Sequence, residues 1–295
     1  MTSISSRVLT AGQACVTACW ATGFSLVGRF RHPTEEWRTT GGERVLVIAP
    51  HPDDELAGCG GVILLHLLAG DSVAVVYATD GRQSRSGGLE PDAMALTREA
   101  EAAEALAALG VSERHWVGLK EGHWQGGELA PALTRILTFH DPSIVYAPSR
   151  VDFHPEHDRV ARVLACLPAL QSVRTVRVYQ VQVPLTRLLA NLVTPIAPVW
   201  GRFESAVACY RSQQGSLRGP LRLKEYAGRA HRVRGPAEEF WEMSPSAYTA
   251  LHTDDSMAFE DRTFRGLRLR SITDPLAFAV GRGTRRRLLA AARRS

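Results

Sequence analysis

The fold of this chain is decided by residues 45–55, which read Val-Leu-Val-Ile-Ala-Pro-His-Pro-Asp-Asp-Glu. The first five residues are apolar and mostly β-branched, which is typical of a buried parallel strand. His51, Asp53, Asp54 and Glu55 then crowd into one turn just past that strand, where open α/β sheets place their sites. A bound divalent metal would offset the cost of burying this cluster. The alternative is a polar turn that caps the next helix, for which one carboxylate would suffice.

A second polar cluster follows another apolar run. Residues 152–158 read Asp-Phe-His-Pro-Glu-His-Asp, and they come after the strand-like residues 144–147. His154 and His157 are three positions apart, close to the spacing that brings two side chains together at the start of a helix. Two strands would thus deliver two His/Asp clusters to the same edge of one sheet, and together the clusters predict a metal site.

Strand-like runs alternate with helical patterns over most of the chain. Strands are expected at 44–49, 72–79, 114–117, 143–147 and 174–183, and helices at 57–69, 92–109, 128–140, 156–167 and 203–213. This alternation predicts an α/β protein with a Rossmann-like, mostly parallel sheet flanked by helices and a less regular C-terminal part. Residues 174–183 suit a less buried strand. Residues 185–200, which are apolar but broken by prolines, suit a lid or an exposed insertion.

A dinucleotide site is not expected at the first turn. Residues 58–61 read Gly-Cys-Gly-Gly and lack the order Gly-x-Gly-x-x-Gly that cradles a pyrophosphate. The turn ahead of them is acidic and would repel phosphate groups.

The motif His-Pro-Asp-Asp-Glu after a strand, with a downstream His-Pro-x-His, resembles the PIG-L/LmbE-like N-deacetylase family. That family includes zinc-dependent enzymes that remove acetyl from N-acetylglucosaminyl compounds, among them deacetylases of the mycothiol and bacillithiol pathways. Lesser matches are Arg98, the loop at 117–122, which usually carries Asp-Gly in the family, and Tyr-Arg-Ser-Gln at 210–213, which resembles a late His-x-Ser-Gln. The resemblance runs from about residue 44 to about residue 214.

The resemblance and the residue types together suggest a metal-assisted hydrolysis. Zinc binds about four ligands and keeps one position for water, and His51, Asp54 and His157 can supply three. Asp53 is expected to act as the general base, and His154 to stabilise the oxyanion or protonate the leaving amine. We expect one zinc ion per chain, although another divalent metal such as iron or manganese stays open.

Substrate recognition and support of the metal ligands fall to four further residues. Arg98 matches a family arginine that reaches the sugar or its anionic substituent, but it could equally pair with a neighbouring glutamate. Glu121 stands where the family often has an Asp that binds sugar hydroxyls; a surface acid is the alternative. Glu55 is expected to support the site without touching the metal, or to cap the helix. Asp152 replaces a tyrosine of mycothiol-type deacetylases and is expected to orient His154 or His157, which argues against mycothiol chemistry.

Composition fits an ordinary soluble protein of 295 residues with a net charge of +5. Such a charge permits anionic partners but does not demand nucleic acid, which we do not expect as a partner. The five cysteines contain no Cys-x-x-Cys pair and read as reduced thiols of a cytoplasmic protein. Residues 8–28 carry no charge but are weakly hydrophobic, so a packed helix is favoured while peripheral membrane association stays open.

These observations predict an N-terminal extension at 1–42, a deacetylase domain at 43–245 and a C-terminal extension with a basic tail at 246–295. The expected function is metal-dependent removal of an acetyl or other acyl group from the amide nitrogen of a small molecule containing N-acetylglucosamine. The alternatives are an amidase that cleaves a larger sugar conjugate, a membrane-bound deacetylase of a lipid-linked sugar, and a non-catalytic metal-binding protein. The oligomeric state stays open.

Overall fold

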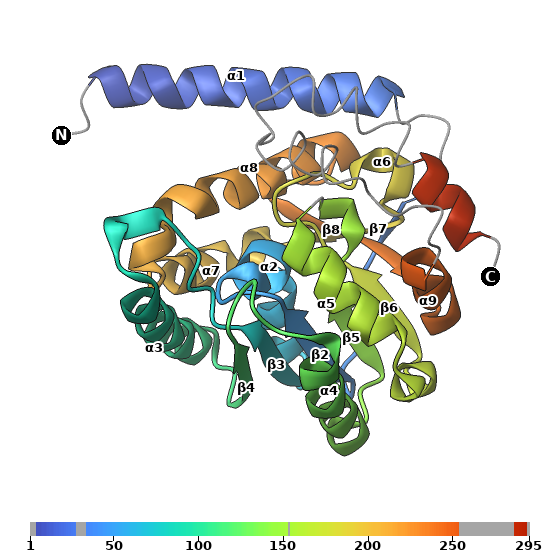
Figure 1. Ribbon diagram of the computed structural model, residues 1–295. Coiled ribbons are helices and arrows are strands. Elements are labelled where there is room, and N and C mark those ends of the chain that lie inside the picture. Colours follow the sequence, from blue (N-terminus) through green and yellow to red (C-terminus); the bar gives the residue numbers. More distant parts are fainter. Residues whose placement is uncertain (1–3, 28–33, 153, 254–285, 294–295) are drawn as a thin grey trace.

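The computed structural model describes residues 4–27, 34–152, 154–253 and 286–293. Its centre is a sheet with the strand order β1-β7-β8-β6-β5-β2-β3-β4 (Figure 1). Five neighbouring strands are parallel and form the Rossmann-like part that the sequence predicted. They are β2 (Arg44–Ala49), β3 (Ser72–Thr79), β4 (Glu113–Leu119), β5 (Ile144–Ala147) and β6 (Thr175–Val178).

Helices cover both faces of this sheet because its strands are apolar on both sides. Val45 and Val47 of β2 pack in one hydrophobic core and Leu46 and Ile48 in the other, since alternate residues of a strand point to opposite faces. The first core contains residues of α2 (Asp54–Leu68), α3 (Pro91–Leu109) and α7 (Trp200–Val207). The second contains residues of α4 (Gly126–His140), α5 (Pro155–Ala165) and α9 (Pro245–Thr253).

The glycines that open α2 allow this helix to pack closely on its neighbours. A Cβ atom on Gly58 would lie 2.5 Å from the ring of Tyr179, and one on Gly61 would lie 2.5 Å from Ile196. These glycines therefore serve close packing of α2 against neighbouring side chains.

The sequence was less informative beyond residue 174. The strand expected at 174–183 is limited to β6 and is more buried than expected, because β8 (Ala237–Met243) pairs with it antiparallel. The expectation of a lid or an exposed insertion at 185–200 is wrong. This segment contains α6 (Thr186–Leu189) and β7 (Leu192–Pro195), and β7 pairs with β8 and is largely buried. The long helix α8 (Gln214–His231) was not predicted.

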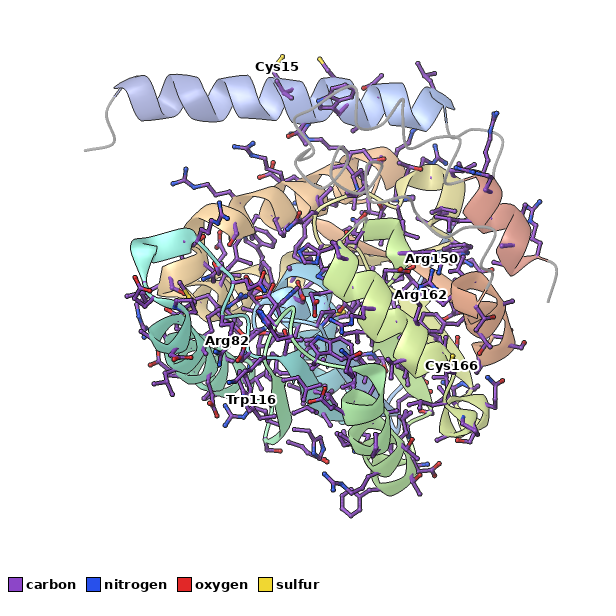
Figure 2. The ribbon with its side chains drawn as sticks, viewed as in Figure 1. Cys15, Arg82, Trp116, Arg150, Arg162 and Cys166 are labelled. Atoms are coloured by element: carbon purple, nitrogen blue, oxygen red, sulfur yellow. The ribbon has the colours of Figure 1, made fainter. Side chains whose placement is uncertain are left out.

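Helix α1 (Ile4–Val27) lies along α8 on the outside of the molecule (Figure 1). Trp20 and Ala21 pack there against Leu223, Tyr226 and Ala230, which agrees with the expected packed helix. Among the described residues, no helix is long and apolar enough to cross a membrane. Cys15 projects outward from α1 in Figure 2, and all five cysteines are free thiols.

Contacts cross both of the domain boundaries expected from the sequence. Ahead of residue 43, β1 (Glu35–Glu36) pairs with β7, and Trp37 packs on His66 and Arg177. After residue 245, α9 and the helical residues 286–292 contribute to the core on the α5 side. The division at 42/43 and 245/246 stays a prediction, and residues 254–285 of the C-terminal extension lie outside the described residues.

Candidate metal-dependent active site

The two polar clusters meet at the carboxyl ends of the neighbouring strands β2 and β5, as the sequence predicted. They line one side of a cavity of about 380 Å³, and the rest is lined by α3, α8 and the loops after β3, β4 and β6. The cavity-lining residues from the clusters are His51, Asp53, Asp54, His154, Pro155, Glu156 and His157. The other lining residues are Ala57, Gln83, Ser84, Arg98, Glu121, Val181, Gln182, Gln213, Ser216, Leu217 and Pro220.

Asp54 lies between two imidazoles. Its Oδ2 atom is 3.1 Å from His51 Nδ1 and 3.2 Å from His157 Nε2. Zinc–ligand distances of about 2.0–2.2 Å would separate neighbouring ligands of one ion by about 3.0–3.5 Å, so these spacings fit a shared divalent metal. His51, His154 and His157 also present ligand atoms within 4.8 Å of one another, which adds His154 to the groups that could hold an ion.

The charges around these histidines favour a cation. Although burial opposes protonation, Glu121 and Asp54 raise the pKa of His51 to about 10. Burial likewise opposes protonation of His157, but Asp54 and Asp152 raise its pKa to about 9. Burial also opposes ionisation of Asp54, yet the two histidines hold the pKa of its carboxyl well below the usual range. The negative charge of these carboxylates, which favours the protonated histidines, would also attract a metal ion.

Asp53 faces away from the histidine pair and has an unusual backbone. Its φ angle is +116°, a region that non-glycine residues rarely adopt and that costs about 1–3 kcal/mol. It precedes α2, but its side chain does not cap that helix. Instead, Oδ1 lies 2.7 Å from a terminal nitrogen of Arg98. Burial raises the pKa of Asp53 to about 6 even with this guanidinium beside it.

Arg98 and Glu121 lie in the cavity wall and are engaged by protein groups. Arg98 is 4% exposed and donates to the carbonyl oxygens of Gly81 and Pro52 as well as contacting Asp53. Glu121 Oε1 lies 3.2 Å from His51 Nε2, and its Oε2 atom accepts a hydrogen bond from Gln83 N. Glu121 is therefore not a surface acid, which was its alternative interpretation. Arg98 pairs with an aspartate and not with a neighbouring glutamate. Their roles toward a substrate stay predictions.

Asp152 contacts His157, one of the two histidines that it was expected to orient. Its Oδ2 atom lies 2.9 Å from His157 Nδ1. Its Oδ1 atom accepts hydrogen bonds from the backbone nitrogens of residues 181–183, at 3.0–3.2 Å. Asp152 thus connects a histidine of the site to the loop after β6, which also lines the cavity. His154 lies beside this pair, with its ring centroid 4.6 Å from that of His157.

The last residue of the second cluster, Asp158, does not line the cavity. Its carboxylate instead binds Arg150 and Arg162, each through a 3.0 Å contact from Nε. Both arginines are labelled in Figure 2, beside α5. Asp158 therefore stabilises the start of α5 rather than contributing to the site.

Several cavity residues were not recognised as site residues from the sequence. Glu156 accepts a 2.6 Å hydrogen bond from Trp124 Nε1, and Gln213 accepts one of 2.9 Å from Ser84 Oγ. Both had a signal in the sequence, since Glu156 occupies the variable place in His-Pro-x-His and Gln213 ends the tetrad at 210–213. Gln182, Ser216, Leu217 and Pro220 had no comparable signal, because only the packing of α8 and the loop after β6 brings them to the cavity.

The sheet and the histidine–carboxylate site define the class of protein to which this chain is similar. Residues 46–166 match the family model described as PIG-L, GlcNAc-PI de-N-acetylase. This match confirms the resemblance to PIG-L/LmbE-like deacetylases, and it includes His51, Asp53, Asp54 and both histidines of the second cluster.

Individual relatives agree with this family. The 1D-myo-inositol 2-acetamido-2-deoxy-alpha-D-glucopyranoside deacetylase of Mycobacterium sp. (strain KMS) is 35% identical over 112 residues, which are 35% of this chain and 35% of the relative. The match thus spans about a third of the length of that relative.

Solved structures share the fold. The N,N'-diacetylchitobiose deacetylase from Pyrococcus horikoshii aligns with a TM-score of 0.59 at 24% identity, covering 70% of this chain and 86% of that one. The 4-carboxy-2-hydroxymuconate hydratase from Pseudomonas putida aligns with a TM-score of 0.53 at 20% identity, covering 67% and 95%. Since one of these proteins is a deacetylase and the other a hydratase, the fold alone does not determine the reaction.

Proposed function

We propose that this protein is a metal-dependent hydrolase that removes an acetyl group from the amide nitrogen of a substrate containing N-acetylglucosamine. The observation that carries this proposal is the separation of roles in one turn. Asp54 shares its carboxylate with His51 and His157, whereas the adjacent Asp53 lines the same cavity without contacting that pair. Metal-assisted hydrolysis needs groups that hold the metal and a separate group that takes the proton of water, and a protein that only binds metal has no use for the second.

His51, Asp54 and His157 would hold the metal, and Asp152 would fix the orientation of His157 through Nδ1. When bound, a divalent metal such as zinc polarises an amide carbonyl and makes water more acidic. Asp53 would take a proton from the attacking water, since it lines the same cavity and burial raises its pKa to about 6, near neutral pH. His154, whose ring lies beside that of His157, would stabilise the oxyanion or protonate the departing amine.

The two deacetylases to which this chain is similar support an amino-sugar substrate, since their names specify an acetylated glucosamine compound and diacetylchitobiose. The cavity also extends from the histidines to Ser216, Leu217 and Pro220 of α8, which leaves room for a group attached to the sugar. That extension keeps an amidase acting on a larger sugar conjugate as the second candidate function.

Acetate release tests the proposal. The purified protein is loaded with zinc, and separately with iron(II) or manganese(II), and is given N,N'-diacetylchitobiose, N-acetylglucosaminyl inositol and N-acetylglucosaminyl malate. We expect acetate from at least one substrate and about one metal ion per chain. His51→Ala and His157→Ala should lose the metal, whereas His115→Ala, which changes a histidine paired with Glu113 outside the cavity, should keep it. Full metal occupancy without release of acetate or of a larger acyl group would overturn the hydrolase assignment.

A further inference from the structure

Tyr210 is a buried residue that the reaction outlined above does not use. It lies between α7 and α8, just ahead of the short 3-10 helix Arg211–Gln213, and its side chain is 0% exposed. Its hydroxyl group donates a 2.7 Å hydrogen bond to Glu55 Oε1, across 155 positions of sequence. Tyr210 therefore links the segment between α7 and α8 to the acidic turn that follows β2.

Glu55 passes this contact on to the backbone of Asp53. Its second carboxylate oxygen, Oε2, accepts a 3.0 Å hydrogen bond from Asp53 N. Glu55 is 0% exposed, so bulk solvent does not reach either oxygen. Two hydrogen bonds in series thus connect the Tyr210 hydroxyl to the residue whose φ angle is +116°.

An unfavourable backbone angle persists only where its surroundings hold it. Arg98 holds the side chain of Asp53 and the carbonyl of the preceding residue. Among the contacts described here, Glu55 Oε2 holds the Asp53 amide, and it can do so only while the carboxylate keeps one rotation. The Tyr210 hydroxyl restrains that rotation by engaging Oε1, and the Tyr77 hydroxyl lies close to both groups.

We propose that Tyr210 is a positioning residue that holds Asp53, through Glu55, in the conformation that a general base requires. The proposal rests on the proposed function for its effect on catalysis, but the two hydrogen bonds do not. In the resembling motif His-x-Ser-Gln a histidine occupies the place of Tyr210, and a histidine can also donate to a carboxylate. The tyrosine of this chain would supply the same donor from a longer side chain.

Tyr210→Phe tests the proposal because it removes one hydroxyl group and keeps the ring. In the metal-loaded protein we expect kcat to fall by about 10-fold to 100-fold with KM and metal content unchanged, since displacing a reacting group by about 1 Å costs up to about that much. Tyr146→Phe is the matched control. It also removes a buried tyrosine hydroxyl, which contacts His66 and Arg177, and should lower the melting temperature without lowering kcat. Tyr210→His should recover much of the lost kcat.

Amide hydrogen exchange supplies a readout that needs neither metal nor activity. We expect the Asp53 amide to exchange faster in Tyr210→Phe than in the wild type, and amides of β3 to exchange equally in both. Equal protection of Asp53 in the two proteins would overturn the proposal, as would a kcat for Tyr210→Phe no lower than that for Tyr146→Phe. Absence of acetate release by the wild type would instead reject the proposed function and leave the exchange experiment to decide the role of Tyr210. If Tyr210→Phe does not fold, the same measurements on Tyr210→His decide between recovery and loss.

Discussion

Asp53 and Asp54 are adjacent in sequence but bind different partners: Asp53 Oδ1 lies 2.7 Å from an Arg98 nitrogen, and Asp54 Oδ2 lies 3.1 Å from His51 Nδ1. The positive φ angle of Asp53 turns the two side chains apart. One turn of chain therefore presents one carboxylate to the histidine pair and the other to Arg98.

Exchanging each aspartate for asparagine should separate these roles. Asp53→Asn keeps the shape but removes the proton acceptor, so turnover should fall by about 10²-fold to 10⁴-fold while metal content stays near wild type. Asp54→Asn should weaken metal binding and lower the rate together. Metal analysis and acetate release measure both. Loss of metal from Asp53→Asn with retention by Asp54→Asn would require the two roles to be exchanged.

Arg98→Lys tests whether this arginine positions Asp53 or binds a substrate anion. Lysine keeps the charge but cannot reproduce the contacts of a planar guanidinium with Asp53 and two carbonyl oxygens. We expect kcat to fall by about 10-fold or more with little change in KM. The kinetic constants for a neutral and a carboxylate-bearing substrate distinguish the two roles. A rise in KM confined to the carboxylate-bearing substrate would assign Arg98 to recognition instead.

Asp152→Asn should weaken metal binding without removing a ligand. The substitution reduces the basicity that Asp152 gives His157 through Nδ1, and loss of such support usually costs about 10-fold to 100-fold in metal affinity. Competition with a chelator measures the affinity. Asp158→Asn is the matched control, because Asp158 lies six positions later and binds Arg150 and Arg162 rather than the histidines. Equal affinities of the two variants would contradict the assignment.

The stability of the metal-free protein should depend on pH through His51. The pKa of His51 is raised from 6.5 to about 10 in the folded protein, so its protonation stabilises the fold fully below about pH 6.5. That contribution should be lost as the pH rises toward 10. Melting temperatures of the metal-free wild type should therefore fall over this range more steeply than those of His51→Gln. The metal-loaded protein should lack this loss, because a metal binds the neutral imidazole. A wild type that becomes more stable than His51→Gln as the pH rises would refute the charge assignment.

Truncation should distinguish α1 from the segment that follows it. A variant that lacks residues 1–33 should keep its metal, because α1 packs on α8 through Trp20 and Ala21 and supplies none of the described residues that line the cavity. A variant that lacks residues 1–43 should be less stable, since it loses β1, the cover that Trp37 gives Arg177, and the bond from Thr39 to Asp71. Metal content and melting temperature measure both. Loss of metal in the shorter deletion would place α1 in the core of the fold.

The sequence by itself determined the parallel half of the fold and the positions of both polar clusters. Strands β2 and β5 are continuous apolar runs, and each is followed by histidines and carboxylates, so local pattern was enough to predict that the clusters meet at one edge of a sheet.

Only the tertiary structure decided which partner each of these residues binds. Arg98 pairs with Asp53, Asp152 with His157, and Tyr210 with Glu55 through contacts between separate elements, which leave no periodic trace in the sequence. The same holds for β8, whose antiparallel pairing buries β6 and β7, and for α8, which completes the cavity. Short-range patterns report which face of an element is buried, whereas the partner on that face depends on how distant elements pack.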